Sequence, residues 1–351
     1  MLKALSFCCL LATIALLAST ATLAQSTVAL SETGSSLLYP VITKWASVYK
    51  TVAPGVTITT ASTGSGAGIA AAAAGTAAIG GSDAYLSDAD LQKDGLLNIP
   101  VTISAQTITY NVPEAGDQRL QFTGGVLADI YRGKVQYWDD HAITALNLPG
   151  VGHLPHVRIV PIVRSDKSGD TFLFTQYLSA SDAAWKQQPG SGLAVTWPAV
   201  DNEIAAKGND GVLKACGDTK YAICYLGISY LVGAGNKGLY YAALSNASGT
   251  FVTPGINAIS AAATAGAPNM PPSQSMSIVF GSEDAYPIVN FEYAVVKAKQ
   301  PNAATAKALR DFLKWAISKD GGNNGGNLYP GFTALPPEVT KRSLQQIDSI
   351  H

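Results

Sequence analysis

The feature that most constrains this chain is a strand-like segment followed by a glycine- and serine-rich loop and then by the start of a helix. The pattern recurs along the chain, with loops at residues 31–36, 62–68 and 165–169. The first N–H groups of a helix have no partners inside the helix, and the helix dipole is positive at that end. Each loop therefore leads into a place that suits an oxyanion.

The third loop follows an arginine. Arg164 directly follows the apolar run 159–163, which is typical of a buried strand. It precedes residues 172–178, in which apolar residues recur at helical spacing. A guanidinium offers a planar fork of donors, which adds to the anion-binding character of the helix start. The same residues also fit ordinary helix capping, and Arg164 with Asp166 fits a surface ion pair. The two other loops favour the anion site over this alternative.

Those two loops support the same interpretation without completing a nucleotide-binding motif. The segment 62–68 lacks a full G-x-G-x-x-G spacing, has no lysine after its last glycine, and has Thr63 where a nucleophile elbow needs glycine. What remains is general: glycines let backbone N–H groups approach an anion, and Ser65 adds a hydroxyl. In the first loop, Ser36 is expected to cap a helix that begins near Pro40. A structural turn is the alternative for either loop taken alone.

Length and composition limit the classes of protein. At 351 residues the chain is expected to form two lobes, and its 47% of hydrophobic residues provides ample core. The formal net charge of −1 argues against nucleic acid bound through a general basic surface. The four histidines show no spacing typical of metal ligands, so neither a metal nor a cofactor is expected.

Residues 1–24 are expected to be a cleavable signal peptide. A lysine near the start gives the positive charge, 10–17 the apolar stretch, and Ala24 ends a small-residue cleavage site. Two cysteines then remain, Cys216 and Cys224, with a short loop between them. Because exported proteins meet an oxidising compartment, a disulfide is predicted in preference to two free thiols.

Five short motifs occur in the order and spacing of a known family. They are Thr33-Gly34-Ser35-Ser36, Thr63-Gly64-Ser65-Gly66-Ala67-Gly68, Gly81-Ser82-Asp83-Ala84, Ile130-Tyr131-Arg132-Gly133 with Trp138-Asp139-Asp140, and Arg164-Ser165-Asp166-Lys167-Ser168-Gly169. On these motifs the chain resembles the PstS family, the periplasmic phosphate-binding proteins of ABC phosphate importers. The resemblance runs from about residue 31 to about residue 339.

The resemblance implies a type II periplasmic-binding-protein fold, in which two α/β lobes joined by hinge strands close on a ligand in the cleft. Lobe 1 would comprise residues 25–104 and 275–351, and lobe 2 residues 105–274. The implied function is that of an extracytoplasmic solute-binding protein, a monomer, that captures inorganic phosphate and delivers it to an ABC permease in the inner membrane. The implied location is the periplasm, and whether secretion continues past the outer membrane stays open.

Carried over by position, the resemblance implies phosphate ligands from both lobes. They are Ser36, Leu37, Ser65, Asp83, Arg164, Ser168, Gly169 and Asp170. Asp166 would steady Arg164 from behind. An ionised carboxylate only accepts hydrogen bonds, so Asp83 would favour a ligand oxygen that carries a proton, as phosphate has near neutral pH, and would disfavour sulfate.

One position departs from the commonest pattern of the family. The chain has Asp170 where many relatives have a threonine after Ser-Gly, so an acceptor replaces a hydroxyl donor. One hypothesis is that Asp170 also accepts a phosphate proton and favours the monobasic form. The alternative is that Asp170 caps the following helix and points away from the ligand.

A secreted phosphatase, or a relative that acts as an adhesin or signalling protein, is the alternative function. Phosphatase chemistry usually needs a metal pair or an activated nucleophile. Ser65 has no histidine near it in any motif, and the histidines do not cluster in the sequence. An enzyme is therefore not expected.

Overall fold

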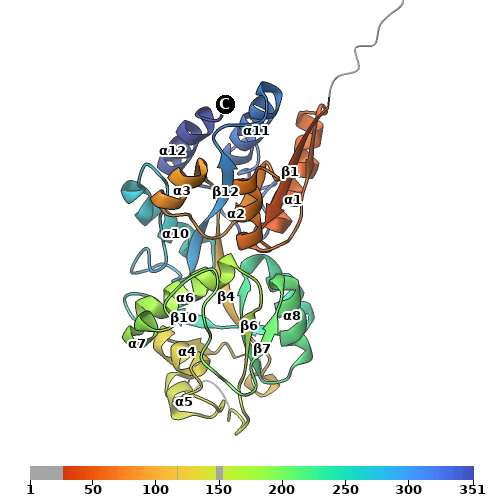
Figure 1. The fold of residues 1–351 in the computed structure, drawn as a ribbon. Coiled ribbons are helices and arrows are strands. Elements are labelled where there is room, and N and C mark those ends of the chain that lie inside the picture. Colours follow the sequence, from red (N-terminus) through yellow and green to blue (C-terminus); the bar gives the residue numbers. More distant parts are fainter. Residues whose placement is uncertain (1–26, 117, 148–152) are drawn as a thin grey trace, which may run out of the picture.

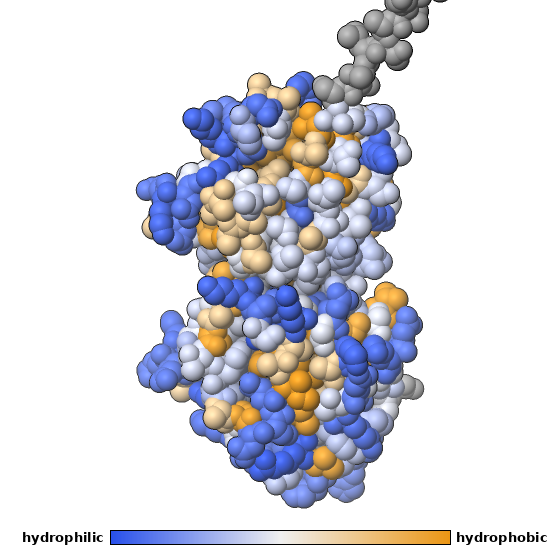
Figure 2. Space-filling model, turned by 45° about the vertical axis from the view of Figure 1, so that its right-hand side comes forward, coloured by the Kyte–Doolittle hydropathy of each residue, from blue (hydrophilic) through white to orange (hydrophobic). Residues whose placement is uncertain are grey.

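The computed structural model describes residues 27–116, 118–147 and 153–351. It has an upper and a lower α/β lobe, and the long strand β4 (Leu96–Tyr110) passes from one into the other (Figure 1). The space-filling view shows a narrow waist between the lobes (Figure 2). This two-lobed α/β architecture confirms the predicted fold class. The predicted signal peptide, residues 1–24, lies outside the described residues.

The upper lobe is built on a mixed sheet in the order β2-β1-β3-β12-β4. Its strands are β1 (Val28–Gly34), β2 (Val56–Thr59), β3 (Ile79–Ser82), β12 (Val289–Lys297) and the first part of β4. β1 is parallel to β2 and β3, whereas β12 is antiparallel to β3 and β4. The helices of this lobe are α1 (Tyr39–Val52), α2 (Ser65–Ala74), α3 (Asp88–Asp94), α10 (Ile256–Gly266), α11 (Ala303–Ile317) and α12 (Pro337–Asp348).

The lower lobe continues the sheet in the order β4-β8-β6-β7. Its strands are β6 (Val160–Arg164), β7 (Ile204–Ala206) and β8 (Ala222–Gly227), and β9 (Tyr240–Tyr241) pairs with β4. A small separate sheet contains β5 (Gln121–Phe122), β10 (Ala243–Ser245) and β11 (Phe251–Val252). The helices are α4 (Gly124–Tyr131), α5 (His141–Asn147), α6 (Gly169–Ser181), α7 (Ala183–Gln187), α8 (Gly208–Asp218) and α9 (Leu231–Asn236). Short 3-10 helices lie at Pro113–Ala115, Ile228–Tyr230 and Ala267–Asn269.

Helix α11 illustrates how apolar residues at helical spacing and a capping residue specify a helix. In α11, Leu309, Phe312 and Leu313 are buried on one face. The side chain of Asn302 accepts a 2.9 Å hydrogen bond from the N–H of Thr305 and so satisfies one of the free donors at the helix start. Among the described residues, no helix is long and apolar enough to cross a membrane.

Strand β4 is the hinge element. Its residues 96–105 pair with β12 in the upper lobe, and 106–110 pair with β8 in the lower lobe. The sequence predicts two strands here, at 99–103 and 107–112, with a crossing between them. The strand is continuous because each half finds its own neighbour, so the backbone hydrogen bonds are satisfied without a loop.

The chain returns to the upper lobe earlier than the sequence predicts. The predicted second boundary, between residues 274 and 275, would leave α10 in the lower lobe. In the structure α10 packs against β12 of the upper lobe, and the Ala258 carbonyl accepts a 3.2 Å hydrogen bond from the N–H of Tyr286. The alanine-, glycine- and proline-rich composition of residues 260–272 indicates a helix end and a linker, but small residues also allow a helix to lie close to a sheet.

The predicted disulfide between Cys216 and Cys224 is absent, and this prediction is corrected. Both cysteines are free and fully buried. Cys216 lies on α8 and Cys224 on β8, in a small core with Ile162 and Leu226. In this interface between helix and sheet the two thiols fill space as small apolar side chains.

Candidate functional site

The loops that the sequence singles out meet between the two lobes. The upper lobe contributes the turn before α1, the start of α2 and the residue after β3. The lower lobe contributes the end of β6 and the start of α6. The predicted site residues are all buried, each at most 5% exposed where a value is given: Ser36, Leu37, Ser65, Asp83, Arg164, Ser168, Gly169 and Asp170.

On the upper lobe, hydroxyl groups surround the carboxylate of Asp83. Ser65, the first residue of α2, donates from Oγ to Asp83 Oδ2 at 3.2 Å, and the Asp83 N–H donates to Ser65 Oγ at 3.3 Å. Ser35 donates from Oγ to Asp83 Oδ1. The sequence motifs included Ser35, but the prediction selected its neighbour Ser36. No sequence signal says which of two adjacent serines faces the carboxylate.

A glycine allows the first loop to come this close to β3. Gly34 has φ of 149°, a conformation that residues with a side chain rarely adopt. A Cβ on Gly34 would lie 2.8 Å from the carbonyl carbon and the nitrogen of Gly81. The close approach is stabilised by the Ser35 N–H, which donates to the Gly81 carbonyl at 2.8 Å.

On the lower lobe, Arg164 is held by two carboxylates. Its Nε and Nη2 donate to Asp166 at 2.8 and 2.6 Å, and its Nη1 donates to Asp170 at 2.5 Å. Burial acts to lower the pKa of Arg164, but the hydrogen bond with Asp166 and the charge of Asp170 raise it above its ordinary value. The guanidinium therefore stays charged although its side chain is 1% exposed.

The lobes touch directly at these loops. A Cβ on Gly169 would lie 2.6 Å from both the Cβ of Asp83 and the Oγ of Ser65. Beside this contact, the Gly66 N–H donates a 3.0 Å hydrogen bond to the carbonyl of Lys167. Glycine at position 169 is required here because a side chain would hold the start of α6 away from the upper lobe.

Asp170 points into the interface and does not cap α6. Ser168 is the cap, since its Oγ accepts the N–H of Thr171 at 3.4 Å. The Asp170 carboxylate accepts from Arg164 and, at 3.1 Å, from the side-chain amide of Gln106 on β4. Of the two orientations considered for this side chain, the structure has the inward one.

Asn209 completes the group, and the sequence analysis missed it. It is fully buried in the first turn of α8, and its Nδ2 donates to Ser36 Oγ at 2.9 Å and to Asp170 Oδ2 at 2.8 Å. Its Oδ1 accepts the N–H of Gly227 at 2.8 Å, which fixes the orientation of the amide. Its signal was a further glycine-containing loop before a helix, at 208–211, which resembles the loops already considered.

Burial and charge set the protonation of Asp83. Burial raises the pKa of Asp83 to about 7, and the negative charge of Asp170 acts in the same direction. Hydrogen bonds from Glu292 and Ser35, and the charge of Arg164, act against this rise. Asp83 is therefore a carboxyl group whose charge depends on its immediate neighbours near neutral pH.

The arrangement suits a small oxyanion that carries a proton. A charged guanidinium, the starts of α2 and α6, and several hydroxyl groups supply donors, and Asp83 supplies an acceptor. Within the described part of the chain, no group of three histidine, cysteine, aspartate or glutamate residues could hold a metal ion.

Comparison with known proteins identifies the family. The model of the PBP superfamily domain matches residues 19–320. The phosphate-binding protein PstS of Methanocaldococcus jannaschii is 35% identical over 343 residues, which cover 93% of this chain and 87% of that protein. PstS of Xylella fastidiosa is 36% identical over 318 residues, 90% of this chain and 84% of that protein. The chain belongs to the PstS family.

Solved structures show the same fold for this PstS-family chain. A high-affinity periplasmic phosphate-binding protein, PfluDING, solved with bound phosphate, has a TM-score of 0.69 and 21% identity, and covers 91% of this chain and 92% of its own. The phosphate-binding protein of Stenotrophomonas maltophilia has a TM-score of 0.66 and 20% identity, with 91% and 94% covered. At this identity the likeness concerns the fold.

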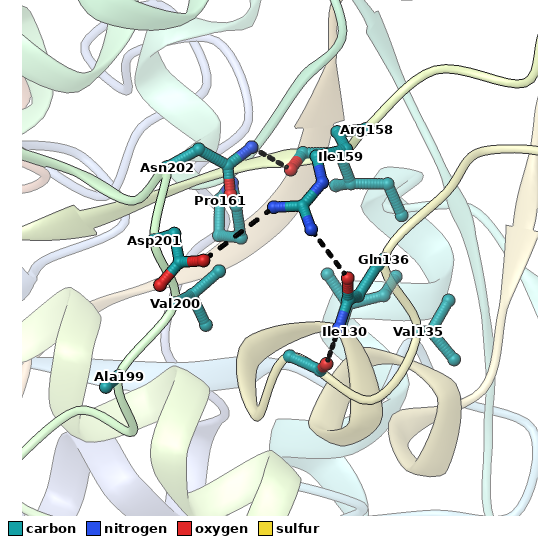
Figure 3. A pocket seen from close by; sticks show the side chains of 11 residues that line it. Ile130, Val135, Gln136, Arg158, Ile159, Pro161, Ala199, Val200, Asp201 and Asn202 are labelled. Carbon is teal, nitrogen blue, oxygen red and sulfur yellow. Dashed lines mark hydrogen bonds and ion pairs between the residues drawn. The ribbon is translucent and has the colours of Figure 1, made fainter.

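A surface pocket in the lower lobe lies outside the site of this PstS-family protein (Figure 3). Arg158 in this pocket donates to Gln136 Oε1 at 3.1 Å and lies 4.0 Å from the carboxylate of Asp201. Its charge is therefore partly compensated by neighbours within the pocket. None of the residues lining the pocket belongs to the predicted site.

Proposed function

We propose that this PstS-family protein binds inorganic phosphate between its lobes and delivers it to an ABC-type phosphate permease. The observation that carries this proposal is the convergence of Arg164, Ser65 and Asp83 from two lobes into one buried interface. The PstS proteins of other organisms, at 35% and 36% identity, carry the name phosphate-binding protein and support it.

The proposed ligands are the residues inferred from the motifs. Hydroxyl groups of Ser36, Ser65 and Ser168, the guanidinium of Arg164, and the N–H groups of Leu37 and Gly169 would donate to phosphate oxygens. Asp166 would hold the guanidinium in place, as its 2.6 and 2.8 Å hydrogen bonds to Arg164 indicate. Many fixed donors offset the cost of burying an anion beside only one positive charge.

Asp83 and Asp170 would set which anion is accepted. Both are buried carboxyl groups, and an ionised carboxylate can only accept. A ligand oxygen that carries a proton can donate to Asp83, whereas a fully ionised sulfate would place an acceptor against an acceptor. Asp170 already accepts from Arg164, Asn209 and Gln106, so it would favour the monobasic form mainly through its charge.

The protein would act as a receptor and not as an enzyme. The lobes meet through Gly66, Lys167 and Gly169, so closure is the property that a permease can read in the loaded protein. We propose export to the periplasm, as the first 24 residues indicate, and action as a monomer.

Two assays on the purified protein test this function. Equilibrium dialysis against labelled phosphate should show one bound phosphate per chain, and incubation with a generic phosphomonoester should release none. Hydrolysis of the ester would favour the phosphatase alternative. Failure to bind any small oxyanion would favour an adhesin or signalling role.

A further inference from the structure

A second buried carboxyl group, Glu292, lies directly behind Asp83. Glu292 is on β12 and is fully buried. Tyr293 pairs with Ser82 of the antiparallel strand β3, so Glu292 lies opposite Asp83, just beyond the last paired residues. The register between β12 and β4 shifts between Glu292 and Tyr293. Such a bulge re-aims a side chain, and bulges are frequent beside functional sites.

The two oxygens of Glu292 have different surroundings. Oε1 accepts from Ser104 Oγ at 2.5 Å and from Asn290 Nδ2 at 3.1 Å. Oε2 is buried without a hydrogen-bond donor among the described residues. The carboxyl of Asp83 also lies within hydrogen-bonding reach of Glu292. Two oxygens that both accept cannot satisfy each other, so this contact requires a proton.

We propose that Glu292 keeps a proton on Oε2, donates a hydrogen bond through it to Asp83, and so holds Asp83 as the ionised acceptor of the anion site. Glu292 is then a positioning residue that determines specificity, because it decides which carboxyl of the pair can accept a proton from the ligand. This proposal rests on the proposed phosphate site and names the group that sets its preference.

The surroundings favour the proton on Glu292 and not on Asp83. Asp83 accepts hydrogen bonds from Ser35 and Ser65 and feels the charge of Arg164, all of which stabilise its ionised form. Among the described residues, the groups that act most strongly on Glu292 are Asp83, Ser104 and Asn290, and none of these is a cation. Burial raises the pKa of Glu292 well above its ordinary value, and the charge of Asp83 acts in the same direction.

Few other titratable groups face this pair. Asp170 and Arg164 act on Asp83 from the lower lobe, and the phenol of Tyr293 adjoins Glu292 on β12. The elements packed against β12 are β3, α2 and α10, which carry no ionisable side chain, and β4, whose only ionisable side chain is Tyr110. Glu32 of β1 lies beside Gly81 of β3, two residues before Asp83, and is a further buried carboxyl near the pair. A pH response of the pair is therefore set mainly by Asp83, Glu292, Asp170 and Arg164, with Glu32 as the next neighbour.

The test compares Glu292→Gln, which keeps a donor but cannot ionise, with Glu292→Leu, which removes the donor. Phosphate affinity is measured by calorimetry from about pH 5 to about pH 9. We expect Glu292→Gln to stay within about threefold of wild type and Glu292→Leu to lose roughly 10- to 100-fold. Thr102→Val is the matched control, since Thr102 on β4 is the strand partner of Glu292 on β12 and its hydroxyl donates to the Thr333 carbonyl, away from the site. An equal loss in both Glu292 variants would overturn the proposal.

Infrared spectroscopy of the phosphate-free protein tests the proton itself. The difference spectrum between wild type and Glu292→Gln should contain the carbonyl band of a protonated carboxyl near neutral pH. Absence of this band would overturn the proposal even if Glu292→Leu fails to fold. Because this measurement needs no ligand, it also separates a failure of the proton assignment from a failure of phosphate binding.

Discussion

The side-chain amide of Asn209 in the lower lobe donates a 2.9 Å hydrogen bond to the hydroxyl of Ser36 in the upper lobe. The Asn209 backbone N–H donates a second one to the same oxygen, at 3.1 Å. Both residues are at most 1% exposed. Asn209 therefore links the two lobes at the point where the proposed ligand is held.

Asn209→Ala is expected to weaken phosphate binding by roughly tenfold or more, because it removes one donor each from the buried Ser36 hydroxyl and Asp170 carboxylate and the acceptor of the buried Gly227 N–H. Calorimetry measures the affinity, and small-angle scattering should show a more open protein. Asn202→Ala is the control, since Asn202 lies in the pocket of Figure 3 and donates to the Ile159 carbonyl. An unchanged affinity for Asn209→Ala would contradict a role in closure.

Gly169→Ala is expected to prevent full closure. The added Cβ would lie 2.6 Å from Ser65 Oγ and from Asp83 Cβ, so either the lobes separate or both side chains move. We expect phosphate affinity to fall by about tenfold or more, while the melting temperature changes little. Gly235→Ala on α9 is the matched control, because no atom lies within 4 Å of its added Cβ. Equal affinities of the two variants would refute the steric argument.

Asp83→Asn is expected to change the selectivity of the site. An amide can donate to a ligand oxygen without a proton, so sulfate should bind more tightly than to wild type, and phosphate roughly 10- to 100-fold more weakly. Competition titrations with both anions measure the ratio. A variant that keeps the wild-type preference for phosphate would show that Asp83 does not discriminate.

Asp170 predicts a pH dependence. If its charge favours monobasic phosphate, the affinity of wild type should fall from mildly acidic to mildly alkaline pH, and Asp170→Asn should show a shallower fall. The change also removes a carboxylate from Arg164, so the slope against pH is informative and the absolute affinity is not. A flat profile in both proteins would count against the hypothesis.

Glu32 predicts a pH dependence of stability. Burial raises the pKa of Glu32 from 4.5 to about 8, and a hydrogen bond from the Ala61 backbone lowers it by a smaller amount. The pKa of Glu32 is higher in the folded protein than in the unfolded chain, so folding favours the protonated carboxyl. The stability that Glu32 contributes is therefore fully present below about pH 4.5 and is lost as pH rises through about 8. At about pH 9, Glu32→Gln should be more stable than wild type by about 2–4 kcal/mol, and near pH 4 by little.

Thermal unfolding at both pH values measures this difference. Glu283→Gln is the control, because Glu283 is exposed. If Glu32→Gln and Glu283→Gln gave the same difference at both pH values, the buried carboxyl would not be the cause.

The local elements were predictable where the signal is local. Gly75 ends α2 in a left-handed conformation, and Asp83 follows β3 directly, as the sequence indicates. Five ordered motifs were enough to select the residues that the fold brings together.

The features that could not be predicted from the sequence depend on contacts between distant segments. Ser36 was expected to cap α1, but Ser35 accepts the Leu38 N–H at 3.0 Å, and Ser36 is occupied by Asn209 from the other lobe. The sequence predicts two strands where the structure has the single strand β4. The partner of β4 changes between residues 105 and 106, and this change of partner leaves no mark in the sequence. Glu292 left a signal that was not used: it is a carboxyl group in the middle of a mostly apolar strand, whose other charged residue, Lys297, is at the strand end.

The proposed anion site is tested most directly by calorimetric titration of the purified protein with phosphate and then with sulfate near neutral pH. The convergence of Arg164 and the helix starts around the acceptor Asp83 predicts one tightly bound phosphate per chain and no measurable heat from sulfate at the same concentrations. Absence of phosphate binding, or sulfate binding of comparable affinity, would contradict it.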